Sequence, residues 1–223
     1  MHCSSLFVER GSGAARRTML ARLALAIGGS AAVLLTPPFA LSYFSAYGAP
    51  SELPPSWLAA LRGPLTGVGI LETGSTSVYD RYGLLYCAAW VLALAGLVGL
   101  LRRQWPELSV RLRRAWAVLV AGLGVGAVGI LGDYAPVDDI AGVIGFLLTG
   151  VGFLIAAVGS ALLGWALRRD GRLDPTAALG VAALGVTSLV GGMALVGHIP
   201  SGPGVGWVLG ALVLGLAGVR SAP

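Results

Sequence analysis

The sequence predicts an all-α integral membrane protein, a polytopic bundle of six transmembrane helices with both termini on the cytoplasmic side. Hydrophobic residues make up 56% of the chain and charged residues 11%, whereas an ordinary soluble domain has roughly 25% charged residues. Several apolar runs reach the roughly 20 residues that a bilayer crossing requires. The arginines gather in alternate connections between these runs, and this asymmetry orients membrane proteins.

The segment from Arg102 to Arg114 determines the predicted orientation. It places five arginines and one glutamate between two long apolar runs. Because basic residues next to transmembrane helices stay in the cytoplasm, this connection is predicted to be cytoplasmic. Counting outward from it leaves only Arg62 and Arg81, of the 15 basic residues, on the outer side. We therefore expect a multi-pass protein of a bacterial cytoplasmic membrane.

Residues 23–223 are predicted to form a single membrane domain behind a short disordered cytoplasmic tail, residues 1–22. The tail shows no hydrophobic periodicity. The first apolar run exceeds the roughly 7 to 15 residues of a signal-peptide core, which favours an uncleaved helix. The six spans are expected at residues 23–47, 82–101, 115–132, 140–167, 175–197 and 205–219.

The longest connection, residues 48–80, is predicted to lie on the outer side. Within it the sequence favours a short helix with Trp57 and Leu58 on one side, ending at Gly63–Pro64. Such a helix is expected to lie in the membrane interface. Whether this segment forms a lid or re-enters the membrane stays open.

The aromatic residues support this topology independently, because Trp and Tyr prefer the two membrane interfaces. All six tyrosines fall at the outer boundary of the expected spans, and three tryptophans fall at the inner one. These residues are Tyr43, Tyr47, Tyr79, Tyr82, Tyr86 and Tyr134 outside, and Trp105, Trp116 and Trp165 inside.

Glycine is the residue expected to hold the helices together. The chain has 35 glycines, and in lipid small residues four apart let helix backbones approach closely. These stripes are expected to pack within the bundle, against a second copy of the chain, or against another membrane protein. The stripes comprise Gly122 and Gly126, then Gly152, Ala156, Ser160 and Gly164, and finally Gly206, Gly210 and Gly218.

A first candidate site is a helix kink in the first span. Pro37–Pro38 removes the amide donors that would bond the carbonyls of Val33 and Leu34. Interrupted helices often mark transporter binding sites, although proline is also frequent in membrane helices for structural reasons. The candidate residues are Val33, Leu34, Thr36, Pro37 and Pro38.

A second candidate site is an acidic rim at the outer ends of the spans. Its carboxylates suit Ca²⁺ or Mg²⁺, and a histidine beside carboxylates can act in acid/base chemistry. The alternative is a solvated rim that sets orientation, with a histidine that caps a helix or lies in the interface. The rim residues are Glu72, Asp80, Asp133, Asp138, Asp139 and His198.

Several classes of protein are disfavoured. The expected spans contain no Asp, Glu, Arg or His, whereas ion-coupled transporters place such groups within the membrane. No nucleotide, zinc or nucleophile motif is present, and Cys3 and Cys87 fall on opposite sides of the membrane. We therefore expect no cofactor, no metal, no catalytic residues and no enzymatic activity. The arginines are expected to attract anionic lipids to the inner face, not nucleic acid.

Three functions remain open from the sequence. The first is a structural or accessory subunit that binds a partner through its glycine stripes. The second is a carrier for a small apolar or weakly polar solute, which would use the kink beside Pro37. The third is a surface-facing metal-dependent enzyme that would use the acidic rim.

Overall fold

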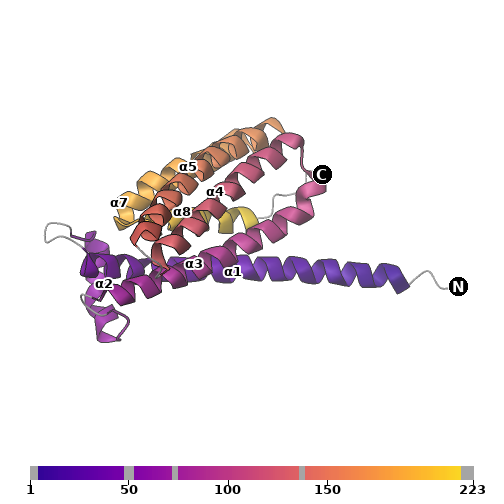
Figure 1. Cartoon of the computed structure of the whole chain (residues 1–223). Coiled ribbons are helices and arrows are strands. Elements are labelled where there is room, and N and C mark those ends of the chain that lie inside the picture. Colours follow the sequence, from indigo (N-terminus) through magenta and orange to yellow (C-terminus); the bar gives the residue numbers. More distant parts are fainter. Residues whose placement is uncertain (1–4, 48–52, 72–74, 136–138, 217–223) are drawn as a thin grey trace.

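A computed structural model describes residues 5–47, 53–71, 75–135 and 139–216, and these residues form helices and short connections without any strand. The helices lie roughly along one axis, with α2 at one end (Figure 1). Their bounds are α1 Ser5–Ala46, α2 Ser56–Gly67, α3 Thr76–Gln104, η1 Trp105–Glu107, α4 Val110–Tyr134, α5 Asp139–Arg169, α6 Pro175–Val186, η2 Thr187–Gly191, α7 Gly192–Val196 and α8 Ser201–Leu216.

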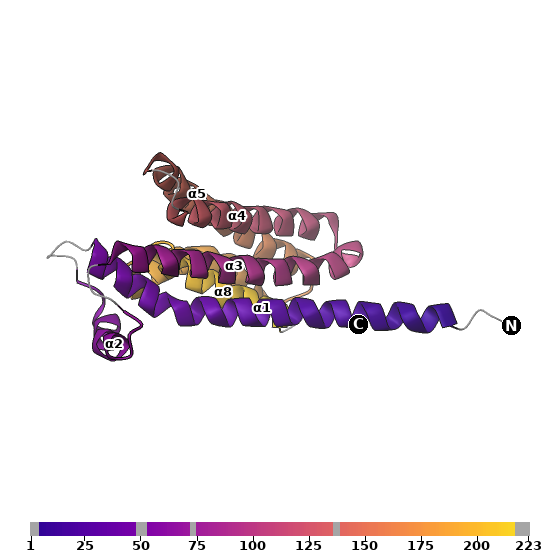
Figure 2. The ribbon, with the colours of Figure 1, turned by 60° about the horizontal axis from the view of Figure 1, so that its bottom comes forward.

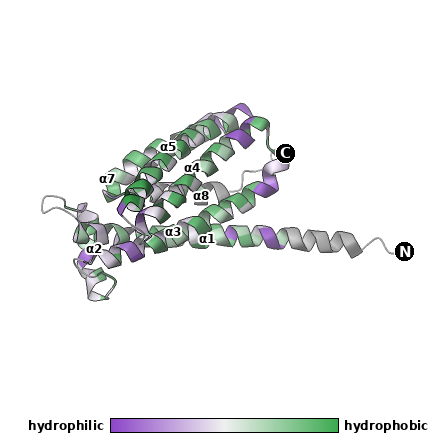
Figure 3. Cartoon of the chain, in the orientation of Figure 1, coloured by the Kyte–Doolittle hydropathy of each residue, from purple (hydrophilic) through white to green (hydrophobic). Residues whose placement is uncertain are grey.

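Five segments of the described chain are long and apolar enough to cross a membrane: Ala15–Ala46, Thr76–Glu107, Val110–Tyr134, Asp139–Arg169 and Pro175–Val196. The last joins α6, the π-helical segment η2 and α7 into one rod. Hydrophobic residues follow the lengths of the helices, and hydrophilic residues gather toward the ends of the bundle (Figure 3). The sixth expected span corresponds to α8, whose 16 described residues fall short of the roughly 20 of a full crossing. Six spans and their orientation therefore stay predictions.

The two ends of the bundle differ in charge. We call the end with Arg102, Arg113 and Arg168 the arginine end, and the end with Asp80 and Asp133 the acidic end. In the topology expected from the sequence, the arginine end is cytoplasmic.

Local sequence explains why the helices turn at the arginine end. The Asp174 carboxylate accepts hydrogen bonds from two amides in the first turn of α6, at 2.9 and 3.0 Å, and Pro175 takes the first helical position, where no amide donor is needed. Ser109 caps α4 by accepting from the Leu112 amide. The arginine-rich segment is consequently a short turn between two helices.

Helix α1 begins at Ser5, where the sequence predicts a disordered tail over residues 1–22. Adding a residue to an existing helix costs far less than starting one, so the first span carries this segment into the helix. The Arg103 guanidinium donates to the Thr18 hydroxyl, which places Thr18 level with the end of α3. The turns before Thr18 extend beyond the bundle (Figure 1).

The axis of α1 changes direction toward the acidic end (Figure 2), and the helix contains Pro37–Pro38 in that part. Helix α1 therefore bends in the part where the sequence predicts a kink. The chain remains helical through both prolines, so the kink bends α1 without interrupting it.

Helix α2 lies against the acidic end of the bundle. Leu58 is fully buried and packs with Leu41 and Val196, and the Trp57 indole donates to the Leu195 carbonyl at 2.6 Å. The helix continues to Gly67, so the predicted stop at Gly63–Pro64 is wrong. Pro64 leaves only one carbonyl of the preceding turn without a helical donor, and that turn is exposed to solvent.

Helices α4 and α5 approach so closely that their glycines cannot carry a side chain. A Cβ atom on Gly152 would lie 2.3 Å from the Gly126 nitrogen, and one on Gly122 would lie 2.4 Å from the Ala156 nitrogen. Small residues permit this backbone contact, on which helix association in lipid depends.

The other glycine stripes also pack within the chain. A Cβ atom on Gly164 would meet the Ala178 carbonyl at 2.4 Å, and one on Gly206 would meet the Ser188 hydroxyl at 2.6 Å. Gly218 lies outside the described residues. The described stripes therefore contribute to the fold of a single chain, and binding of a second copy through them stays a prediction.

Gly152→Ala should destabilise the α4–α5 pair by about 1 to 3 kcal/mol, the usual cost of overpacking a tight contact. Gly150→Ala is the matched control on the same helix, because no atom lies within 4 Å of its added Cβ. Thermal unfolding in detergent micelles measures the difference. Equal midpoints for the two variants would contradict the proposed contact.

Candidate functional site

The acidic end contains a buried group of aromatic side chains from four parts of the fold. Phe39 of α1 is fully buried at its centre. Its ring lies 4.8 Å from the His198 ring, 5.2 Å from the Tyr134 ring and 5.5 Å from the Tyr79 ring, measured between centroids. Tyr43 adds a further ring 4.8 Å from His198. We call these five residues the aromatic cluster.

Two glycines allow the cluster to form. A Cβ atom on Gly83 of α3 would lie 2.1 Å from the Tyr134 ring, so only glycine leaves room for this ring between α3 and α4. Gly197 ends α7 in the left-handed conformation, with φ of 71°, which glycine adopts at little cost. The turn that follows carries His198 into the bundle.

A chain of hydrogen bonds links the polar atoms of the cluster. His198 Nδ1 lies 2.7 Å from the Ser201 hydroxyl, and His198 Nε2 lies 3.1 Å from the Tyr79 hydroxyl. The Tyr79 and Tyr134 hydroxyls are 2.7 Å apart. The chain therefore joins the turn before α8 to the acidic ends of α3 and α4.

Each hydroxyl of this chain can donate or accept, and a neutral imidazole has one donor and one acceptor nitrogen. The Ser201 and Tyr79 hydroxyls can therefore pair with the two His198 nitrogens in either tautomer. Both ring nitrogens are satisfied in the neutral imidazole, so the buried histidine needs no counter-ion.

Burial lowers the pKa of His198 to about 3, because the low-dielectric interior disfavours the charged ring. The side chain is 2% exposed. A general base needs a pKa nearer neutrality and contact with the reacting group. The buried His198 ring thus packs on Phe39 of α1 and bonds Tyr79 of α3.

The structure brings together part of the predicted acidic rim. Asp80 and Asp133 lie close enough for their carboxylates to repel one another, and the Tyr79 hydroxyl links His198 to Tyr134, the residue after Asp133. Asp139 is exposed, and Glu72 and Asp138 lie outside the described residues. Within the described part of the chain, no three His, Cys, Asp or Glu side chains are grouped as metal ligands.

The predicted kink site adjoins the same cluster. The Thr36 hydroxyl donates to the Ala32 carbonyl of its own helix at 2.9 Å. Pro38 is buried and directly precedes Phe39. Val33 is half-buried, whereas Leu34 is 75% exposed and faces away from the bundle. The kink site and the acidic rim therefore adjoin one another at Phe39. Leu34 takes no part in this contact.

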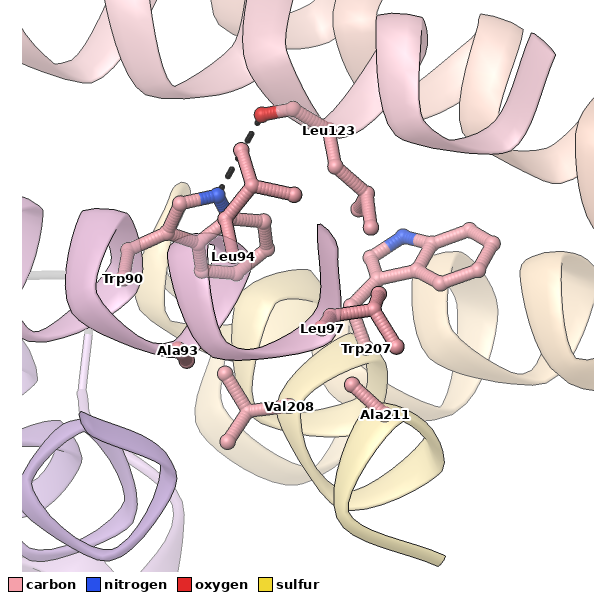
Figure 4. A pocket seen from close by; sticks show the side chains of 8 residues that line it. All are labelled: Trp90, Ala93, Leu94, Leu97, Leu123, Trp207, Val208 and Ala211. Atoms are coloured by element: carbon pink, nitrogen blue, oxygen red, sulfur yellow. Dashed lines mark hydrogen bonds between the residues drawn. The ribbon is translucent and has the colours of Figure 1, made fainter. Parts of the chain in front are cut away.

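A small cavity lies deeper in the bundle, where α3, α4 and α8 meet (Figure 4). Its volume is about 20 Å³, enough for one water molecule. The Trp90 indole donates to the Leu123 carbonyl at 3.3 Å. The Trp207 indole N–H also lies at this cavity and has no hydrogen-bond partner among the described residues.

Two further buried hydroxyls near α8 lack partners within the described chain, those of Tyr86 and Ser188. A Cβ atom on Gly204 would lie 2.2 Å from the Tyr86 hydroxyl. Unpaired buried polar groups are rare in proteins. The first half of α8 therefore adjoins three of the buried polar atoms that lack a partner in the described chain.

The pairing of Tyr79 with Tyr134 was not predicted, because both residues fit the aromatic boundary of a membrane helix. One signal in the sequence points to it. Tyr79–Asp80 and Asp133–Tyr134 are mirror-image pairs near the acidic ends of two successive helices. Antiparallel neighbours bring such pairs to the same level.

Comparisons with known proteins give no match to the chain, whether with protein-family models, curated proteins or solved structures.

Tyr79→Phe should destabilise the protein by about 1 to 3 kcal/mol, because it leaves His198 Nε2 and the Tyr134 hydroxyl without a shared partner. Tyr43→Phe is the control, since Tyr43 packs on His198 but its hydroxyl makes no hydrogen bond to the described residues. Chemical unfolding in mixed micelles measures both. A loss for Tyr43→Phe as large as that for Tyr79→Phe would argue against the hydrogen-bond chain.

Stability should fall as the pH drops from about 6.5 toward 3. The pKa of His198 is 6.5 in the unfolded chain and about 3 in the fold, so over this range the unfolded state binds the extra proton. The slope contributed is at most about 1.4 kcal/mol per pH unit. Relative to wild type, His198→Gln should lose this contribution between pH 6 and 4. Parallel pH profiles of the two proteins would refute it.

Proposed function

We propose that the protein is a non-enzymatic accessory membrane protein that acts by binding a partner. The aromatic cluster carries this proposal. Phe39, Tyr79, Tyr134 and His198 are each at most 9% exposed, and the Tyr79 hydroxyl forms hydrogen bonds to both Tyr134 and His198. Because a substrate cannot reach side chains that are closed to solvent, we infer that the cluster holds the helices together and does not carry out chemistry.

The projecting part of α1 supports the same proposal. The turns before Thr18 extend beyond the other helices at the arginine end (Figure 2). Met19 and Leu20, at the base of this extension, are 63% and 55% exposed beside Arg16 and Arg17. An exposed basic part of a helix is a natural attachment point for a partner with an acidic surface.

A small-solute carrier is the second candidate. The unpaired Tyr86 and Ser188 hydroxyls and the Trp207 indole favour it, because binding sites at membrane depth are built from polar groups of irregular helices. Ser188 belongs to the π-helical segment η2, and such segments are frequent at functional sites. A carrier would require the acidic end to open.

Accessibility of introduced cysteines distinguishes the two proposals. In a chain with Cys3 and Cys87 replaced by alanine, Ser42→Cys and Ser77→Cys would be treated with a membrane-impermeant maleimide. Ser42 is 1% exposed and lies on α1 between Phe39 and Tyr43 of the cluster, whereas Ser77 is exposed at the same end. We expect at least about a hundredfold slower labelling at position 42, the factor set by a local opening cost of about 3 kcal/mol. Comparable rates would favour the carrier.

A further inference from the structure

An amphipathic groove opens between α3 and α4 at the arginine end of the bundle. Its volume is about 370 Å³. Aliphatic side chains, two indole rings and one guanidinium line it: Val98, Leu101, Arg102, Trp105, Trp116, Ala117 and Val120. We propose that this groove binds one anionic phospholipid, with its phosphate on Arg102 and an acyl chain between α3 and α4. This inference does not depend on the proposed accessory function.

Arg102 is the basic residue that lines the groove, and its guanidinium is available to a ligand. Its side chain is exposed, and within the described chain it forms no ion pair or hydrogen bond. Arg103 beside it donates to Thr18, and Arg113 donates to the Leu108 and Pro106 carbonyls at 3.0 and 3.1 Å. A guanidinium presents several donors in the geometry that phosphate oxygens accept.

The rest of the groove suits a hydrocarbon chain. Leu101 and Trp116 are 6% and 2% exposed and form its base, while Val98 and Val120 are half-buried along its sides. These side chains recur at helical spacing on the facing sides of α3 and α4. The apolar surface therefore runs along the helices, in the direction that an acyl chain takes in a bilayer.

The mouth of the groove lies where a lipid headgroup would be expected. Trp105 is 37% exposed and follows directly on α3, three residues after Arg102. Tryptophan prefers the headgroup level of a membrane. Arg102 and Trp105 thus mark the polar boundary, and Val98 lies one turn deeper.

The chemistry of the groove favours a lipid as its occupant. Arg102 provides a cation beside an otherwise apolar and aromatic lining. An anionic headgroup joined to a hydrocarbon chain matches both parts of this surface.

Native mass spectrometry of the full chain in detergent, titrated with phosphatidylglycerol or phosphatidylcholine of identical acyl chains, tests the proposal. We expect one phosphatidylglycerol to bind about tenfold more tightly than phosphatidylcholine, as one charge-assisted contact provides. Arg102→Gln should abolish this preference. Arg111→Gln should retain it, because Arg111 carries the same charge on α4 but does not line the groove.

Two further measurements test the shape of the site. Ala117→Phe should weaken phosphatidylglycerol binding about tenfold by filling the groove, with Arg102 intact and an unchanged melting midpoint in lipid-free detergent. Glycerol phosphate at millimolar concentration should not displace the lipid, since it lacks the chain. The proposal is overturned if wild type shows no preference, if Arg102→Gln retains the preference, or if Arg111→Gln loses as much as Arg102→Gln. It is equally overturned if Ala117→Phe binds normally or if glycerol phosphate competes.

Discussion

Backbone contact between helices is the constraint on which the rest of this structure depends. In lipid, helices gain nothing from hydrophobic exclusion, so their association rests on close packing. Gly152 joins α5 to α4 in this way. Helix α1 contacts α3 equally closely, because a Cβ atom on Gly28 would lie 2.4 Å from the Ala93 nitrogen. Helix α7 contacts α8 through Gly192, whose added Cβ atom would lie 2.3 Å from the Gly202 carbonyl. The bundle is therefore built from tightly packed pairs, and bulky side chains fill the seam between α3 and α4.

That seam is closed at one end and open at the other. At the acidic end the Tyr79 and Tyr134 hydroxyls join α3 to α4 at 2.7 Å, and further along the Trp90 indole bonds the Leu123 carbonyl of α4. Beyond Leu123, within the described chain, no hydrogen bond joins the two helices. The central cavity and then the amphipathic groove follow in this direction. The contact between α3 and α4 is therefore hydrogen-bonded toward the acidic end, and a path through the whole bundle would require the aromatic cluster to part.

The sequence predicts the features that depend on local chemistry. The start of the fifth span follows from Asp174 and Pro175, which cap a helix wherever it packs. The convergence of Tyr79, Tyr134 and His198 depends instead on how three helices rotate about their axes, and apolar helices of similar composition leave that rotation undetermined. The predicted helix end at Gly63–Pro64 is wrong for a related reason, because the exposed turn before Pro64 tolerates a missing donor. Five of the six expected spans appear as long apolar helices.

His198 shows why a polar residue near a helix end does not by itself indicate a site. From the sequence it belongs to a rim of carboxylates, yet in the fold it lies behind Tyr79 with both nitrogens bonded. Burying it is affordable only in the neutral state, since an uncompensated buried charge costs several kcal/mol. The contacts are consistent with that state, because Ser201 and Tyr79 give each ring nitrogen a partner. The polarity of the acidic end therefore holds the turn before α8 against α3 and α4, and this attachment keeps α8 beside the seam that its Trp207 helps to fill.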